Sequence, residues 1–211
     1  MFRLVFKHMF NAVKRKDILI ITSNGKLSNK LINRLQSSYS GIQILQDRTM
    51  TFKKMVFIFK NNQKLNLKFY LNLVFNELIR KQFKYKKIKS FSNKDELLNH
   101  LNEIKPKLIL VFRGSYIFPL SILTDYKIFN IHCADIGKEE YKGLGGVYLS
   151  YINKEKKTFV SFHHMDVELD SGDIILKKEY DFDFKKSFFY NENLAYDTGI
   201  DLLISQIEEA E

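Results

Sequence analysis

Two polar residues in the second half of the chain have the types and the spacing that acyl-group chemistry needs. Asn130 and His132 lie two residues apart in the apolar stretch 128–132, so in a strand both side chains leave the same face. An asparagine amide can donate to a developing oxyanion, and a histidine can take or deliver a proton near neutral pH. The pair therefore predicts a site where a carbonyl carbon becomes tetrahedral, although polar pairs also end strands without such a role.

A third candidate follows in the acidic, turn-forming segment MDVELDSGDII, residues 165–175. Asp170 stands there beside Ser171 and Gly172, between two stretches with strand character. A carboxylate next to His132 would stabilise the protonated imidazole. Loop carboxylates more often cap a turn or face water, so the residues by themselves leave the role of Asp170 open.

These residues need a sheet to position them, and the chain supplies short apolar stretches. Strands are predicted at residues 17–22, 42–45, 87–91, 108–112 and 128–132, with a later pair at 159–165 and 173–176. Helical spacing occupies the intervals between the strands, which predicts an α/β fold: a Rossmann-like, mostly parallel twisted sheet flanked by helices. Ligands bind outside the carboxyl ends of such strands, and Asn130 and His132 lie at one of those ends.

The helices have recognisable periodicity and, in one case, a recognisable start. They are predicted at residues 1–16, 26–36, 93–104 and 193–207. Asn93 is the expected N-cap of the third of these, with Glu96 as its capping-box partner. The length and the lack of a Ser- or Gly-rich linker predict one domain over residues 1–211.

Composition narrows the cellular setting. The single cysteine, Cys133, excludes an intrachain disulfide and favours a reducing compartment, so we expect a cytoplasmic protein. Basic residues interrupt the apolar pattern at the start of the chain, so we expect no secretory signal. The sequence contains no apolar run of about 18 residues that could span a membrane.

The net charge of +10 arises in a basic helical region at about 52–89, where ten Lys and Arg80 oppose Glu77 alone (11 − 1 = 10). Such a region can bind phosphate or nucleic acid. It can equally be a solvated helix face, or a face that pairs with another copy, and the oligomeric state stays open. Few aromatic residues in it suit base stacking, so a nucleic-acid partner is not expected.

Residues 107–180 resemble the superfamily of formyltransferases that use N10-formyltetrahydrofolate, which includes glycinamide ribonucleotide, methionyl-tRNA and nucleotide-sugar N-formyltransferases. The family pattern has an Asn-x-His strand end, a Tyr-Lys/Arg-Gly turn and an Asp-x-Gly loop. Asn130 and His132 match the first, residues 141–143 the second and residues 170–172 the third, in the same order and at similar separation. The resemblance implies the formyltransferase fold and transfer of a formyl group from N10-formyltetrahydrofolate to a primary amine.

The resemblance also implies roles for individual residues. Asn130 would hold the formyl oxygen, His132 would manage the protons, and Asp170 would hold His132 and stabilise its charge. Reduced folate would bind between two loops, largely through main-chain groups. The first loop comprises Arg113, Gly114, Ser115, Tyr116 and Ile117, and the second comprises Met165, Asp166, Val167, Glu168 and Leu169.

The acceptor is the open question, and a small-molecule amine on a nucleotide-linked amino sugar, as in surface-glycan biosynthesis, fits best. A methionyl-tRNA enzyme would need a second domain, and we expect none after the closing helix. Residues 23–25 could cradle a phosphate, but they lack the first glycine of the loop in the glycinamide ribonucleotide enzymes. Ser23, Asn24 and Lys142 are the candidate acceptor contacts. The alternative from another class is a non-enzymatic basic α/β module that binds phosphorylated ligands or RNA.

Departures from the family pattern concern the acceptor side. Ala134 stands where most members have Ser, and the loop 136–140 is longer and lacks a Pro. The pairs at 132–133 and 163–164 raise the question of a metal, but neighbours on a strand point to opposite faces and the spacing fits no standard zinc motif. We therefore expect no metal, and we expect Cys133 to be a buried structural thiol.

Overall fold

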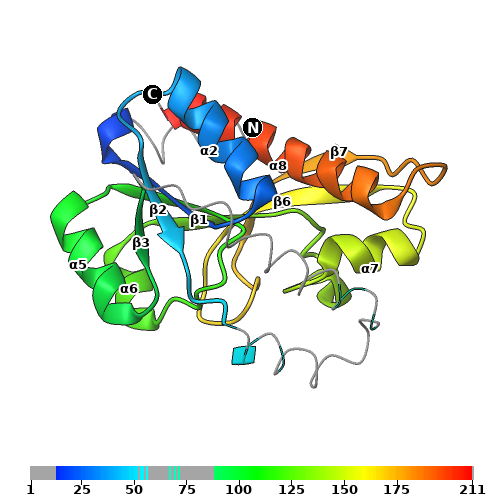
Figure 1. Ribbon diagram of the computed structural model, residues 1–211, viewed down its shortest axis with the longest axis horizontal. Helices are drawn as coiled ribbons and strands as arrows, with labels where there is room; N and C mark the ends of the chain where they lie inside the picture. The colour runs from blue at the N-terminus through cyan, green and yellow to red at the C-terminus, as the bar shows by residue number, and fades with distance from the viewer. Residues whose placement is uncertain are drawn as a thin grey trace.

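The computed structural model describes residues 13–51 and 88–210, together with the single positions 53, 54, 56, 67, 69 and 71. Most of the basic region at about 52–89, and most of the helix predicted for residues 1–16, lie outside the described residues. The two long described segments together form one sheet and the helices that cover it (Figure 1).

The elements follow one another largely as the sequence predicts. The strands are β1 (Ile18–Ser23), β2 (Gln43–Asp47), β3 (Lys89–Phe91), β4 (Leu108–Phe112), β5 (Ile128–His132), β6 (Thr158–His164) and β7 (Ile174–Tyr180). The helices are α2 (Lys26–Ser38), α5 (Lys94–Ile104), α6 (Leu120–Asp125), α7 (Gly146–Ile152) and α8 (Phe188–Ala210), with 3-10 turns η1 (Arg15–Asp17) and η2 (Glu139–Tyr141). The sequence does not predict α6 and α7, because both are short and α7 begins at a pair of glycines, which are poor helix formers.

The sheet has seven strands in the order β3-β2-β1-β4-β5-β6-β7. Strands β1 to β5 pair in parallel, whereas β6 and β7 join antiparallel. This arrangement confirms the mostly parallel α/β fold. In the antiparallel register, Asn130 on β5 lies opposite His163 on β6, and His132 lies opposite Ser161.

Helices cover both faces of the sheet. Figure 1 shows α2 and α8 side by side on one face and α5 with α6 on the other. In β1, Ile18 and Ile20 pack into the cluster that contains residues of α2 and α8, whereas Leu19 and Ile21 pack with residues of α5. Burial on both faces explains why the parallel strands appear in the sequence as continuous apolar runs. Among the helices that the structure describes, none has the length and apolar character needed to cross a bilayer.

The start of α5 confirms one local prediction and corrects its partner. Asn93 caps the helix, with its side chain accepting from the N–H of Glu96 at 2.9 Å. The carboxylate of Glu96 does not return to the N–H of Asn93 as a capping box requires. It accepts instead from the N–H of Ser92 at 2.7 Å, one residue further back.

Candidate active site

Strand β5 places Asn130 and His132 on the same face of the sheet. Phe129 and Ile131 point into the core cluster shared with α8, so the alternate residues point to the opposite face. His132 is the last residue of the strand, and Asn130 is buried two residues before it. Both therefore lie at the carboxyl end of a strand inside the sheet, where open parallel sheets bind their ligands.

The loop between β6 and β7 brings Asp170 onto this pair. Its Oδ2 lies 3.1 Å from Nδ1 of His132, and its Oδ1 accepts a hydrogen bond of 3.1 Å from Nδ2 of Asn130. The backbone N–H of Gly143 donates to Oδ2 at 2.8 Å. The three segments of the family pattern thus meet at one carboxylate, which is only 8% exposed.

Both ring nitrogens of His132 face hydrogen-bond acceptors. Nδ1 faces the carboxylate of Asp170, and Nε2 lies 2.9 Å from the backbone oxygen of Tyr141. Because a carbonyl oxygen only accepts, Nε2 carries a proton and donates it to Tyr141. The ring is therefore held between the carboxylate of Asp170 and the backbone of Tyr141.

Asp170 supplies a fixed negative charge at this position. Burial alone would raise its pKa, because burial penalises the charged form. The pKa nevertheless lies well below its usual range, because the charge on His132 and the N–H of Gly143 outweigh the burial. Asp170 is thus ionised at neutral pH.

Glycines allow the Asp170 loop and the turn that faces it to approach closely. A Cβ on Gly172 would lie 2.0 Å from the backbone oxygen of His164, so any larger residue would push the loop off β6. Gly143 has a φ of 72°, and a Cβ there would lie 2.8 Å from a methyl carbon of Leu169. Asp170 itself has a φ of 50°, a conformation rare for residues other than glycine, which its three donors hold in place.

The loop after β4, predicted to hold folate, is organised by Asp47, a residue that the sequence pattern does not single out. Asp47, the last residue of β2, is fully buried and accepts hydrogen bonds from the N–H of Ser115 and from the N–H of Tyr116 at 2.8 Å. It also accepts from the N–H of Thr49 at 2.8 Å. The one sequence signal for Asp47 is that an acidic residue ends an apolar strand. Its role in the loop could not be predicted, because two of its partners lie 68 and 69 positions away.

The first residue of that loop turns away from it. Arg113 has a left-handed φ of 59°, and its guanidinium carbon lies 4.4 Å from the ring centroid of Tyr196 on α8. Its charge also lowers the pKa of Glu192, which burial raises more strongly. The side chain of Arg113 therefore belongs to the surroundings of α8, whereas Gly114 and Ile117 are exposed in the loop itself.

Both predicted folate loops present exposed apolar side chains. Val167 and Leu169 are exposed, as is Ile117 in the first loop. Met165 packs against the same core cluster as Tyr116 in the first loop. Exposed apolar groups beside loop backbone fit a flat heteroaromatic ring such as a pterin.

The acidic members of the second loop make local contacts. A carboxylate oxygen of Asp166 accepts from the N–H of Val167 at 2.6 Å, and the backbone oxygen of Glu168 accepts from the hydroxyl of Ser171 at 3.0 Å. Both acidic side chains are exposed. These contacts shape the loop and leave Asp170 as the carboxylate that faces the β5 pair.

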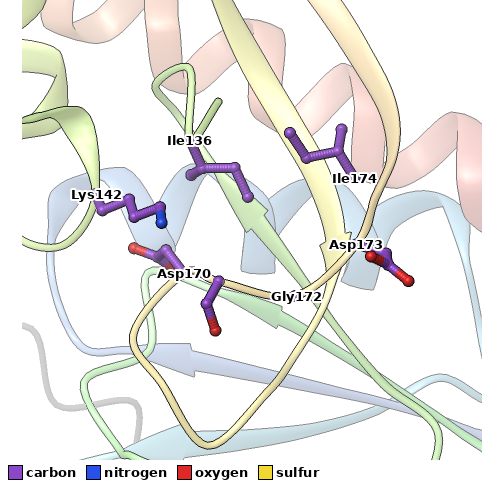
Figure 2. A pocket seen from close by; sticks show the side chains of 7 residues that line it. Ile136, Lys142, Asp170, Gly172, Asp173 and Ile174 are labelled. Atoms are coloured by element: carbon purple, nitrogen blue, oxygen red, sulfur yellow. The ribbon is translucent and has the colours of Figure 1, made fainter. Parts of the chain in front are cut away.

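An open pocket of about 260 Å³ lies beside Asp170 (Figure 2). Its lining consists of Ile136, Lys142, Asp170, Ser171, Gly172, Asp173 and Ile174. Lys142, a predicted acceptor contact, borders the pocket, and its ammonium group pairs with Glu139 at 2.6 Å. Figure 2 shows Lys142 near Asp170, with Asp173 and Ile174 further along the pocket. The structure therefore brings Lys142 together with the catalytic candidates.

The other two predicted acceptor contacts lie on the far side of β4. Ser23 ends β1, and its hydroxyl lies 3.0 Å from the hydroxyl of Ser28 in α2. Asn24 follows in the bend before α2, whose N-cap Gly25 provides no side-chain cap. The structure thus places Ser23 and Asn24 at a second strand end, with β4 between them and β5.

The family departures lie in apolar surroundings. Ala134 is fully buried in a cluster with Tyr141, Tyr148 and Leu149, where the hydroxyl of a serine would need a partner. Cys133 is buried against α8, and burial raises the pKa of its thiol, as expected of a structural cysteine. Within the described part of the chain, no three His, Cys, Asp or Glu side chains are grouped so that they could hold a metal.

Comparison with known sequences gives relatives over part of the chain, although no family model matches it. Over 115 residues, 54% of this chain, it is 29% identical to a methionyl-tRNA formyltransferase of Rickettsia rickettsii (strain Iowa), and the match covers 37% of that relative. Over 85 residues, 39% of this chain, it is 39% identical to the methionyl-tRNA formyltransferase of Alkaliphilus oremlandii (strain OhILAs), covering 27% of it. The matches thus span between about a quarter and little more than a third of the length of these relatives.

Comparison with solved structures extends over nearly all of the chain. A sugar N-formyltransferase from Shewanella sp. superposes with a TM-score of 0.61 at 18% identity, covering 92% of this chain and 69% of that one. Phosphoribosylglycinamide formyltransferase from Anaplasma phagocytophilum gives 0.58 at 18% identity, covering 87% and 80%. A sugar 3N-formyltransferase solved in the presence of dTDP and 5-N-formyl-THF gives 0.55 at 18% identity, covering 91% and 62%.

The sheet order and the cluster at the end of β5 define an α/β protein with the formyltransferase fold. The sequence relatives agree with this fold over the segment that they match. The chain thus has the formyltransferase fold, and part of it is similar in sequence to methionyl-tRNA formyltransferases.

Proposed function

We propose that this protein is a folate-dependent N-formyltransferase that acts on a primary amine in the cytoplasm. The observation that carries the proposal is the cluster at the end of β5, where the buried carboxylate of Asp170 holds both His132 and Asn130. A carboxylate, an imidazole and an amide joined in this way supply fixed charge, proton transfer and hydrogen-bond donation within one site.

His132 and Asp170 would manage the protons of the reaction. The attacking amine has to be neutral and loses a proton as its bond to the formyl carbon forms, while the leaving nitrogen of the donor gains one. Nε2 of His132 now donates to the backbone oxygen of Tyr141 and would turn this hydrogen bond towards the reactants. Asp170 would stabilise the charged ring without taking the proton itself. Because the carboxylate is already in place beside the ring, it would not need to move during the reaction.

Asn130 would hold the formyl oxygen as negative charge develops on it. Its two N–H groups donate to Asp170 Oδ1 and to His163 Nε2, both at 3.1 Å. The hydrogen directed at Asp170 is the better one to redirect, because the carboxylate keeps His132 and Gly143 as donors. His163 would instead lose its amide donor, so we assign the Asp170-facing N–H to the formyl oxygen.

The donor N10-formyltetrahydrofolate would supply the activated one-carbon unit. The residues of this chain that would hold it are Gly114 to Ile117 and Met165 to Asp170, whose exposed apolar side chains suit a pterin. Asp47 would keep the first loop in its binding shape through the N–H groups of Ser115 and Tyr116.

For the acceptor we propose a nucleotide-linked amino sugar. Structural neighbours that are sugar N-formyltransferases support this choice, one of them in the presence of dTDP and 5-N-formyl-THF. The pocket next to Asp170, bordered by the cation of Lys142, would receive the amine-bearing end. The second candidate is a methionyl-tRNA acceptor, which the sequence relatives favour over the segment that they match.

A formylation assay across acceptors tests the proposal. Nucleotide-linked amino sugars, glycinamide ribonucleotide and aminoacylated tRNA are each incubated with the donor, and the added formyl mass is measured. We expect a product with at least one amino sugar. Product only with tRNA would establish the second candidate. If RNA but not 5-formyltetrahydrofolate raised the melting temperature, the result would support the basic binding module and contradict the proposed enzyme activity.

A further inference from the structure

His163 is a buried histidine next to the catalytic candidates, on the strand that pairs with β5. It is 1% exposed and lies opposite Asn130 in the register of β5 and β6. Its Nδ1 lies 2.7 Å from the backbone oxygen of His164. A carbonyl oxygen only accepts, so Nδ1 carries a proton. In the neutral ring, Nε2 then carries a lone pair and acts as an acceptor.

That lone pair determines the orientation of the Asn130 amide. Nδ2 of Asn130 lies 3.1 Å from Nε2 of His163 and 3.1 Å from Oδ1 of Asp170. Both partners are acceptors, so the NH₂ group must lie between them. With the amide reversed, its oxygen would face a carboxylate and a lone pair at hydrogen-bond distance, which is strongly unfavourable in a buried site.

The protonated form of His163 does not fit this arrangement. A proton on Nε2 would meet the NH₂ group of Asn130 at 3.1 Å, which offers no acceptor, whereas Oδ1 of Asp170 lies 3.6 Å away, beyond hydrogen-bond distance. The neutral ring with its proton on Nδ1 therefore satisfies the contacts of both side chains. The backbone of β6, through the oxygen of His164, fixes that tautomer.

We propose that His163 is a positioning residue that anchors one N–H of Asn130 and leaves the other free to move from Asp170 to the formyl oxygen. This inference rests on the formyltransferase activity proposed above. Without the anchor, both hydrogens of the amide would be drawn to Asp170 or the amide would rotate, and the oxyanion would lose an aligned donor.

Paired substitutions test the anchor. In His163→Leu the acceptor is lost, and we expect kcat to fall by about 10- to 100-fold, less than the full loss of an oxyanion donor, with the Kd for 5-formyltetrahydrofolate unchanged. In His163→Gln a side-chain oxygen can accept from Asn130, and most of the kcat should return. His164→Leu is the matched control, because that ring packs against Phe129 on the other face of the strand and should leave kcat within about twofold.

The double variant separates positioning from general damage. In the Asn130→Ala background, His163→Leu should change kcat by less than about twofold, because there is no amide left to position. Additive losses in this pair would overturn the proposal, as would a His163→Gln variant no more active than His163→Leu. If His163→Leu does not fold, the comparison of His163→Gln with wild type and the spectrum described next still decide.

Nitrogen NMR of histidine-labelled protein supplies a result that does not depend on turnover. We expect His163 to carry its proton on Nδ1, where the backbone oxygen of His164 accepts it, and no proton on Nε2. A proton on Nε2 would overturn the inference. If the wild type neither bound folate nor formylated an acceptor, the proposed activity would be contradicted. The spectrum would still show whether His163 accepts a hydrogen bond from Asn130.

Discussion

The carboxyl ends of β5 and β1 lie on either side of β4, yet they are built differently. At the end of β5, Asp170 receives donors from Asn130, His132 and a backbone N–H, and both side chains have a further partner. At the end of β1, the hydroxyl of Ser23 meets Ser28, and α2 starts at Gly25 without a side-chain cap. The first end is held in one arrangement by the protein itself, as a reacting site requires, whereas at the second we propose that a bound acceptor contributes contacts.

The largest expected effect comes from removing the imidazole at the held end. His132→Ala should lower kcat by about 100- to 10,000-fold, because proton transfer to and from the reactants is lost. The Kd for 5-formyltetrahydrofolate, measured by calorimetry, should stay within about twofold because the folate loops are untouched. A variant with kcat near that of the wild type would remove the distinction between the two strand ends.

A smaller effect is expected from the carboxylate that organises the first folate loop. Asp47→Asn replaces an acceptor of several hydrogen bonds by a group that offers one acceptor atom, and charged hydrogen bonds are worth about 1.5–3 kcal/mol each. We expect the Kd for 5-formyltetrahydrofolate to rise by about tenfold or more in calorimetry. Asp95→Asn, at an exposed carboxylate in the first turn of α5, is a suitable control and should leave the Kd unchanged.

Asp170 should also make stability depend on pH at the acid side. Its pKa in the folded protein is lower than its ordinary value, so its stabilising contribution is complete above about pH 4, the unfolded value, and is lost as the pH falls towards the folded pKa. Asp170→Asn should therefore be less stable than the wild type by about 1–3 kcal/mol near pH 6, and the difference should shrink by about pH 3. Urea unfolding at the two pH values measures it. A difference that grows on acidification would contradict the assigned sign.

The smallest effect is expected at the end of β1. Ser23→Ala removes one hydroxyl that bonds to Ser28, and the free energy of unfolding should change by no more than about 1 kcal/mol. The KM for the acceptor should rise while kcat and the folate Kd stay constant, because this end is proposed to bind and not to react. A fall in kcat at unchanged KM would show that the two ends share one role.

The sequence predicts the frame of this arrangement better than its details. Strand β5 and the shared face of Asn130 and His132 follow from an apolar run with a period of two. Asp170 follows from the family resemblance. Asp47 could not be predicted, because its partners are main-chain groups of a loop far along the chain.

Other misses have similarly physical causes. The neighbouring histidines at 163–164 raise the question of a metal. The sequence of the chain does not show that the ring of His163 bonds to Asn130 instead. The sequence assigns Arg113 to the folate loop through its main chain and does not show that its side chain lies against Tyr196. Both cases depend on side-chain direction, which periodicity fixes only inside regular elements.

The central claim is that His132 and Asp170 act as one unit at the end of β5, and a double-mutant cycle on kcat tests it most directly. The cycle compares His132→Ala, Asp170→Asn and the double variant, each shown to bind 5-formyltetrahydrofolate. Because Asp170 acts through the ring at 3.1 Å, the double variant should be no more than a few-fold slower than His132→Ala alone. Independent, multiplying losses, or single variants within a few-fold of wild type, would contradict the mechanism.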